Sequence, residues 1–159
     1  MPVNHDSVLG RAVIKMSGSK AFRAVGPVVP HLDRFLHRVT GGRVIMSGGM
    51  LPSMVLTTTG AKTGQRRQTP LATKPEGNSW YVVGSNFGKE THPAWTANLI
   101  ANPDAEVSFK AKSTRVHAHL LTTEEKAEVW PHLVKFWPNY DVYTERSGRD
   151  LRVFRLDPR

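Results

Sequence analysis

The sequence pattern changes near residue 53, and this change constrains the fold more than any other feature of the chain. β-Branched residues dominate the segment Met54-Val55-Leu56-Thr57-Thr58-Thr59, which runs into a glycine-rich turn. Further short segments of strand character follow between turns, at residues 69–74, 80–84, 105–110 and 114–121. This succession predicts a meander of antiparallel strands that forms a small barrel.

Helices are predicted between and after these strands. Residues 92–101 fit a short helix with Pro93 in its first turn. Thr122 and Glu125 form a capping box that opens a helix running to Phe136, and Pro131 is expected to kink or split that helix. The remaining elements are a turn at residues 75–78, a short helix at 139–147 and a last strand at 151–156.

The first 50 residues are predicted to form a helical extension, distinct from a cofactor-binding domain over residues 51–159. Leu9, Val13 and Met16 share one helical face, and a second short helix is expected at residues 31–39. Basic residues surround the apolar stripe. The helix therefore either lies on an anionic membrane surface or packs on the protein's own body, and both interpretations stay open.

The basic charge is confined to the first half of the sequence. The chain has 22 basic and 13 acidic residues and a formal net charge of +9. Residues 1–75 contain eleven basic groups against only Asp6 and Asp33, whereas residues 76–159 contain eleven of each sign. Such an excess predicts an acidic partner. Nucleic acid is not expected, because the aromatic residues that would stack on bases cluster in the half without net charge.

Absent residue types exclude several classes of chemistry. The chain has no cysteine, so it has no disulfide, no thiolate nucleophile and no cysteine-ligated metal. His117 and His119 share one face of a predicted strand without a third ligand, so no metal site is expected. Charged residues interrupt every long apolar segment, which predicts neither a signal peptide nor a membrane span. We therefore expect a cytoplasmic protein.

The turn after the first predicted strand has the composition of an anion site. Gly60 and Gly64 let backbone amides turn toward a ligand, and Lys62, Arg66 and Arg67 add positive charge there. The spacing does not match a Walker loop. From the residues alone, a phosphate cradle and a solvated turn with exposed cations are both open interpretations.

Two further segments have both a functional and a structural interpretation. The loop over residues 84–90 offers Ser85 and Asn86 as hydrogen-bonding groups, either for an anion or ring edge or as parts of an ordinary turn. An aromatic stripe follows later in the chain. It is either core or a wall for a flat organic substrate, and it consists of Phe136, Trp137, Tyr140 and Tyr143.

Several of these residues belong to motifs that follow one another in register. The first three motifs are Thr57-Thr58-Thr59-Gly60-x-Lys62-Thr63-Gly64-Gln65-x-Arg67-x-x-Pro70-Leu71, Ser85-x-x-Gly88 and His92-Pro93-x-Trp95-x-x-Asn98-Leu99-x-Ala101-Asn102-Pro103. Glu125-x-Ala127-x-x-Trp130-Pro131 and Pro138-x-Tyr140-x-x-Tyr143 complete the set. With these motifs the chain resembles the deazaflavin-dependent nitroreductase family of actinobacteria, from about residue 53 to its end.

The resemblance implies an α+β fold, a split β-barrel with flanking helices. It also implies coenzyme F420, an 8-hydroxy-5-deazaflavin with a phosphate and a polyglutamate tail, whose hydride such proteins pass to quinones, nitro compounds or activated enones. The implied cofactor-binding residues are Lys62, Thr63, Arg66, Arg67, Pro70, Ser85, Asn86, Ala94 and Trp95. The implied substrate wall is Trp137, Tyr140 and Tyr143, with Tyr143, Tyr140 and Ser85 as the groups that assist catalysis.

Three departures from the family pattern affect the acceptor more than the cofactor. Ala72 stands where close relatives often have an aromatic residue, Asn86 where some have lysine, and Trp137 where tyrosine is common. The identity of the acceptor therefore stays open. The alternatives to an F420-dependent reductase are a split-barrel reductase that uses FMN, a non-catalytic F420 carrier and a membrane-surface binding module.

Overall fold

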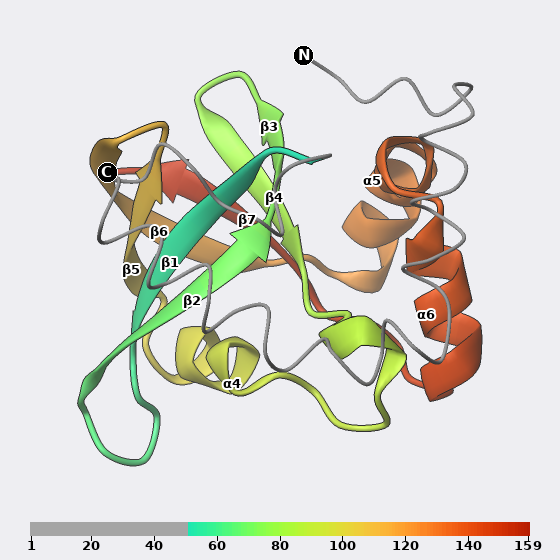
Figure 1. Cartoon of the computed structure of the whole chain (residues 1–159), viewed down its shortest axis with the longest axis horizontal. Helices are drawn as coiled ribbons and strands as arrows, with labels where there is room; N and C mark the ends of the chain where they lie inside the picture. Colours follow the sequence, from blue (N-terminus) through green and yellow to red (C-terminus); the bar gives the residue numbers. More distant parts are fainter. Residues whose placement is uncertain (1–50) are drawn as a thin grey trace.

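A single curled sheet organises the part of the chain that the structure describes. The computed structural model describes residues 51–159, so the helices and the domain boundary expected within residues 1–50 lie outside the described residues. The sheet has seven strands, and three α-helices pack at its ends (Figure 1). The structure thus confirms the expected α+β class and its split-barrel form, in which the sheet curls without full closure.

All strand pairs in the sheet are antiparallel, but the expected meander is wrong: β2 pairs only with β1, and β3 and β4 lie on the other half of the sheet beside β7, because the chain crosses over at Thr73. The strand order is β2-β1-β5-β6-β7-β4-β3, with β2 and β3 at the two edges. The strands are β1 (Ser53–Thr59), β2 (Arg66–Ala72), β3 (Lys74–Glu76), β4 (Ser79–Val83), β5 (Asp104–Phe109), β6 (Lys112–Leu120) and β7 (Val153–Pro158).

The two edges of the sheet meet at Thr73, the single residue between β2 and β3. Thr73 is fully buried. Its backbone N–H donates to the carbonyl of Pro52 at 2.9 Å, next to β1, and its hydroxyl donates to the carbonyl of Tyr81 in β4 at 3.0 Å. One residue therefore bonds to both halves of the sheet, through its backbone on one side and its hydroxyl on the other, which holds the curl at that end.

Three predictions around this point are wrong. The predicted strand at residues 69–74 is instead two strands, because the chain turns inward at Thr73. β2 also begins earlier, at Arg66, since the hairpin continues outward as an exposed polar ladder that pairs Arg66 with Thr59. Pro75 and Glu76, expected in a turn, belong to β3, and the turn is confined to Gly77 and Asn78.

The helices are η1 (Asn86–Gly88), a short 3₁₀ helix, and α4 (Ala94–Ala101), α5 (Thr123–Phe136) and α6 (Asn139–Ser147). The capping box is confirmed: the Thr122 hydroxyl accepts from the Glu125 N–H at 3.2 Å, and the Glu125 carboxylate accepts from the Thr122 N–H at 2.8 Å. The expected split at Pro131 is wrong, because α5 continues through it as one helix. Pro131 has no N–H and so removes one bond of the ladder, but the helix continues on both sides of it, and the Trp137 N–H still donates to the carbonyl of Leu133.

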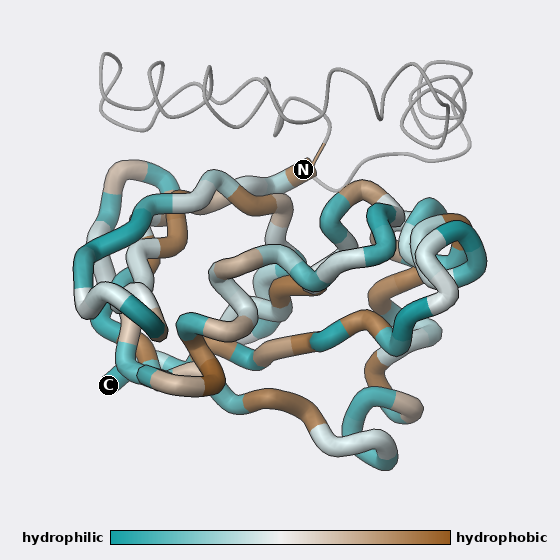
Figure 2. The backbone as a smooth tube through the Cα atoms, turned by 90° about the horizontal axis from the view of Figure 1, so that it is seen from below, coloured by the Kyte–Doolittle hydropathy of each residue, from teal (hydrophilic) through white to brown (hydrophobic). Residues whose placement is uncertain are grey.

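Two apolar clusters fill the molecule. One lies inside the curl of the sheet, where Trp95 and Leu99 of α4 pack on strand residues such as Leu56 and Phe154. The other lies between the sheet and the helices α5 and α6, around Leu133. Apolar segments alternate with polar ones along the chain (Figure 2). Within residues 51–159, no helix is long and apolar enough to cross a membrane, and no group of metal-ligating side chains occurs.

Candidate functional site

Most of the predicted cofactor residues lie beside one end of the strands. The hairpin loop between β1 and β2, helix α4 and the loop with η1 follow one another along that end, and α6 packs against η1 (Figure 1). Segments that are far apart in the sequence thus form one continuous region. This region has three parts: a cationic hairpin loop over residues 60–67, a second loop over residues 84–92, and the aromatic face of α6.

The cationic hairpin loop has an ordered backbone and free positive side chains. Gly60 N–H donates to the carbonyl of Gln65 at 2.8 Å, and Gly64 N–H donates to that of Gly60 at 2.9 Å. Gly64 has a φ of 68°, which favours glycine. The side chains of Lys62 and Arg67 are exposed and make no hydrogen bond or ion pair with any residue in the described range 51–159. They remain available to an anionic ligand.

The hairpin also separates its two arginines. Successive residues of a strand point to opposite faces, so Arg66 and Arg67 lie on opposite sides of β2. Arg66 lies 3.6 Å from Glu106 and lines a surface cavity of about 300 Å³, together with Arg115 and Arg159. No residue of the second loop or of α6 lines that cavity. Arg67 thus faces away from the side on which Arg66 lies.

Asn98 of α4 holds the backbone at the start of the hairpin loop. Its side-chain oxygen accepts from the N–H of Ala61 at 2.9 Å, and its amide nitrogen donates to the hydroxyl of Thr58 at 3.0 Å. Asn98 is buried, so its amide is committed to these contacts. In the sequence, Asn98 was only one member of a motif. Its anchoring role could not be derived, because it depends on α4 lying across the end of β1.

The second loop has an unusual backbone. Asn86, Phe87 and Gly88 have φ values of 47°, 54° and 74°, so three consecutive residues are left-handed. A Cβ on Gly88 would lie 3.0 Å from Cδ of Arg146 and 3.3 Å from Cδ1 of Tyr143, so the loop packs directly on α6. The Asn86 side chain donates to the carbonyl of Thr91 at 2.9 Å. The Ser85 hydroxyl has no hydrogen-bond partner within residues 51–159.

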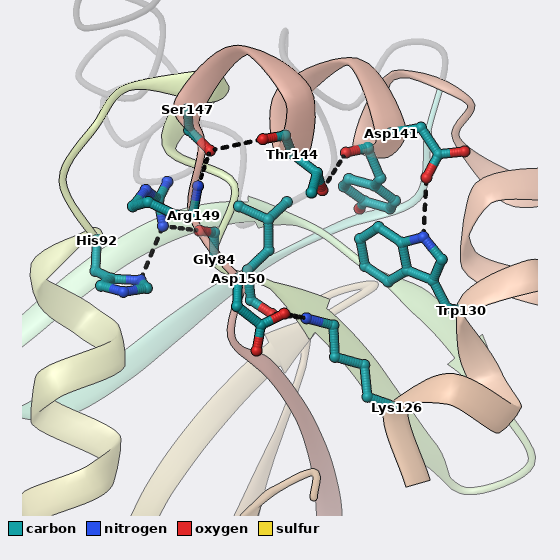
Figure 3. Close-up of polar contacts among 11 residues, drawn as sticks. Gly84, His92, Lys126, Trp130, Asp141, Thr144, Ser147, Arg149 and Asp150 are labelled. Atoms are coloured by element: carbon teal, nitrogen blue, oxygen red, sulfur yellow. Dashed lines mark hydrogen bonds and ion pairs between the residues drawn. The ribbon is translucent and has the colours of Figure 1, made fainter. Parts of the chain in front are cut away.

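Arg149 also binds this loop, a role that no pattern in the sequence predicted. Its guanidinium donates to the carbonyls of Lys89 at 2.9 Å, Ser85 at 3.0 Å and Gly84 at 3.4 Å. It also donates to Nδ1 of His92 at 2.8 Å (Figure 3). Arginine has only donors, so His92 accepts as the neutral imidazole. Burial, assisted by Arg152 and Arg149, lowers the pKa of His92, which favours that neutral form.

The predicted substrate wall is part of the second apolar cluster. Trp137, Tyr140 and Tyr143 are all buried within the described residues, against α5 and the sheet. Burial raises the pKa of Tyr140 far above its ordinary value, and the neighbouring Tyr143 adds to the shift. The Tyr140 hydroxyl is therefore protonated at any physiological pH and can act as a neutral donor. Tyr143 also contacts the second loop at Gly88, which joins this wall to the predicted ring site.

Three further predicted residues differ in their surroundings. Ala94 is exposed at the first position of α4. Trp95 is buried, with its ring 5.7 Å from that of Phe154, so its side chain belongs to the core. Pro70 is buried in β2 opposite Val55, away from the tip of the hairpin. Of these three, only Ala94 presents its side chain at the surface beside the two loops.

These features fit an elongated anionic cofactor with a polar ring. The free cations Lys62 and Arg67 suit a phosphate and acidic tail. The Ser85 hydroxyl suits a ring edge. Nη1 of Arg146, next to Tyr143 on the same face of α6, is buried without a hydrogen-bond partner, and a ligand oxygen there would satisfy it. The fold and these groups together define a split-barrel reductase that binds a deazaflavin or a flavin.

Comparison with known proteins agrees with this class. The model of the F420H(2)-dependent quinone reductase family matches residues 32–158. The chain is 34% identical over 141 residues to F420H(2)-dependent quinone reductase Rv1261c of Mycobacterium tuberculosis, covering 86% of this chain and 95% of that protein. It therefore belongs to the F420H(2)-dependent quinone reductase family. The expectations of an oxidoreductase, of F420 as cofactor and of hydride transfer to a quinone are confirmed.

Solved structures agree as well. A structure of an F420-H2 dependent reductase, FDR-A, superposes with a TM-score of 0.61 at 34% identity and covers 67% of this chain and 94% of that chain. HutZ, a heme storage protein from Vibrio cholerae, superposes with a TM-score of 0.52 at 15% identity, over 68% of this chain and 82% of its own. The second likeness concerns the fold alone.

Proposed function

We propose that the cationic hairpin loop and the second loop together hold F420, and that α6 presents the quinone acceptor with a hydrogen-bond donor. The observation that carries this proposal is that the hairpin loop, the second loop and α6 lie beside the same end of the strands. Asn98 bonds to the hairpin loop, and Tyr143 packs against the second loop. Lys62, Thr63 and Arg67 bind the phosphate and the first part of the tail, and Arg66 is a helper on the opposite face.

Reduced F420 supplies the hydride when it is bound, and the protein supplies position and electrostatics. Ser85 donates its free hydroxyl to the edge of the ring, and Asn86 and Ala94 lie along it. Trp95 and Pro70 act from the core by shaping the backbone that the cofactor meets. This division follows from exposure, because the first three side chains are accessible and the last two are buried.

The acceptor is a quinone whose oxygen gains negative charge as hydride arrives. Tyr143 or Tyr140 donates a hydrogen bond to that oxygen, and a preorganised donor in a site without water stabilises such charge strongly. The raised pKa of Tyr140 keeps that donor protonated. Trp137 closes the same cluster. Neither a histidine nor a carboxylate is needed as the acid.

The choice of cofactor is tested by titrating the purified protein with F420 and with FMN. FMN has one phosphate and no polyglutamate tail, so the free cations of the hairpin loop favour F420. We expect tighter binding of F420, with an affinity that falls as salt is added. Tighter binding of FMN would contradict the proposal. Binding of F420 without oxidation of F420H2 by any quinone would support a non-catalytic carrier instead.

A secondary part of the proposal concerns residues 1–40 and an anionic membrane. It depends on sequence charge alone, since residues 1–43 contain seven basic residues, from Arg11 to Arg43, and only Asp6 and Asp33 are acidic. The test is sedimentation with vesicles that contain anionic lipid. We expect the full chain to sediment and the chain lacking residues 1–40 to remain in solution while it retains its affinity for F420. Equal behaviour of the two chains would remove this part.

A further inference from the structure

The left-handed backbone conformation in the second loop costs free energy, so other contacts must stabilise it. Asn86 and Phe87 carry side chains, and such residues adopt positive φ only when their surroundings impose it. Within the loop, Gly88 N–H donates to the carbonyl of Ser85 at 2.9 Å, Lys89 N–H to that of Asn86 at 3.1 Å, and the Asn86 side chain to that of Thr91 at 2.9 Å, but none of these bonds joins the start of the loop at Gly84 to its later part. The surroundings must therefore hold this backbone.

Arg149 makes the contacts that hold it. Its guanidinium donates to the carbonyls of Gly84 and Ser85, which precede the left-handed stretch, and to that of Lys89, which follows it. One rigid planar group thus ties together both ends of the strained segment. Arg149 is itself fixed, because its own N–H donates to the hydroxyl of Ser147 at 3.2 Å, at the end of α6 (Figure 3).

We propose that Arg149 is a positioning residue for the cofactor: it clamps the loop over residues 84–92 and so holds Ser85 and Asn86 in the conformation that the deazaflavin ring meets. The inference rests on the proposed function, since it takes the ring to lie along this loop. It adds a residue that touches neither the cofactor nor the acceptor. Preorganisation of the loop raises affinity, because less ordering remains to be done on binding.

His92 is the fourth contact of the clamp and makes it sensitive to pH. Its Nδ1 accepts from Arg149, and protonation at Nδ1 replaces this acceptor with a donor. The charged groups that act on His92 are Arg149 and Arg152, which oppose its protonation, and Asp150, which favours it. Helix α4, which follows His92, carries no charged side chain. Acidification through the lowered pKa of His92 should therefore loosen the clamp.

The test measures the dissociation constant of oxidised F420, from its fluorescence, together with amide hydrogen exchange at Gly88 and Lys89. Arg149→Lys keeps the charge but cannot reach all four acceptors. We expect about tenfold weaker binding, as for the loss of one hydrogen bond to a charged group, and faster exchange at both amides. Arg155→Lys, on β7 and away from the loop, is the matched control and should change neither quantity.

A pH series separates positioning from general damage to the fold. In the wild-type protein, F420 affinity should fall as the pH drops through the pKa of His92. His92→Asn retains an acceptor oxygen near the place of Nδ1 and cannot be protonated there, so its affinity should not show this fall. This comparison also decides the matter if Arg149→Lys does not fold.

Two results would overturn the inference. One is an Arg149→Lys variant with wild-type affinity and exchange, and the other is a wild-type and a His92→Asn protein whose affinities change with pH in the same way. Failure of the proposed function looks different, because the wild-type protein itself would then not bind F420.

Discussion

Charged side chains at the site divide into two kinds, according to what they touch. The side chains of Lys62 and Arg67 make no hydrogen bond or ion pair within residues 51–159, so their charge is available to a ligand. In Arg149, every guanidinium nitrogen donates to a backbone carbonyl or to His92. Substitutions of the two kinds should therefore differ in effect: the first should change electrostatic attraction, and the second should change the shape of the site.

Lys62→Ala should weaken F420 binding by about tenfold, because one charge-assisted contact with the anionic cofactor is lost. The dependence of the dissociation constant on salt should also become flatter, since one fewer cation is screened. Both quantities come from fluorescence titrations at several salt concentrations. Lys112→Ala is the control, since Lys112 is exposed at the start of β6, away from both loops. Unchanged affinity of Lys62→Ala would remove the hairpin loop from the cofactor site.

Tyr143→Phe should lower kcat by about a hundredfold, the loss expected when one donor to a developing negative charge is removed. Affinity for oxidised F420 should change little. The measurement is steady-state oxidation of F420H2 by a quinone, combined with a binding titration. Tyr140→Phe in the same assays shows which hydroxyl donates. Equal turnover of both variants and the wild-type protein would exclude the tyrosines as donors.

Local signals in the sequence located most elements, and the exceptions have physical causes. The capping box predicted the start of α5 because its two hydrogen bonds join Thr122 and Glu125, which are only three residues apart. The division of β2 from β3 could not be predicted, because it depends on Thr73 bonding to both halves of a curled sheet. For the same reason the role of Arg149 was not predictable: its partners lie 57 to 65 residues away in the sequence.

The capping box gives a stability prediction for α5. Thr122→Ala should lower the free energy of unfolding by about 1 kcal/mol, because the hydroxyl that accepts from the Glu125 N–H is lost. Thr122→Ser keeps an acceptor and should retain most of the stability. Chemical denaturation of the three proteins measures the difference. Equal stability of the alanine variant and the wild type would show that the cap does not stabilise the native state.

The pH dependence of this cap has a definite sign. The backbone N–H of Thr122 and then His119 lower the pKa of Glu125 in the folded state. A carboxylate whose pKa is lowered on folding stabilises the protein above its unfolded pKa, and this contribution is lost as the pH falls through the folded value. The stability advantage of the wild type over Glu125→Gln should therefore be present at neutral pH and be lost as the pH falls through the folded pKa of Glu125, as measured by chemical denaturation at several pH values.

Across the whole molecule, the fold brings together segments that carry no shared local signal. Resemblance to a family predicted the split barrel, the cofactor and the reaction, and the comparisons confirm these three. The roles of individual site residues remain predictions. Burial now distinguishes them, because Trp95 and Pro70 support the site from the core while Lys62, Arg67 and Ser85 offer free polar atoms to it.

The central claim is that this chain passes hydride from reduced F420 to a quinone at the site formed by the cationic hairpin loop, helix α4 and the second loop (Figure 1). The most direct measurement follows the reappearance of the absorbance of oxidised F420 when the protein, F420H2 and 2-methyl-1,4-naphthoquinone are mixed without oxygen. We predict oxidation at a rate proportional to the protein concentration and greatly reduced by Tyr143→Phe or Tyr140→Phe. Tight binding of F420 with no oxidation by this quinone or by others would contradict the claim.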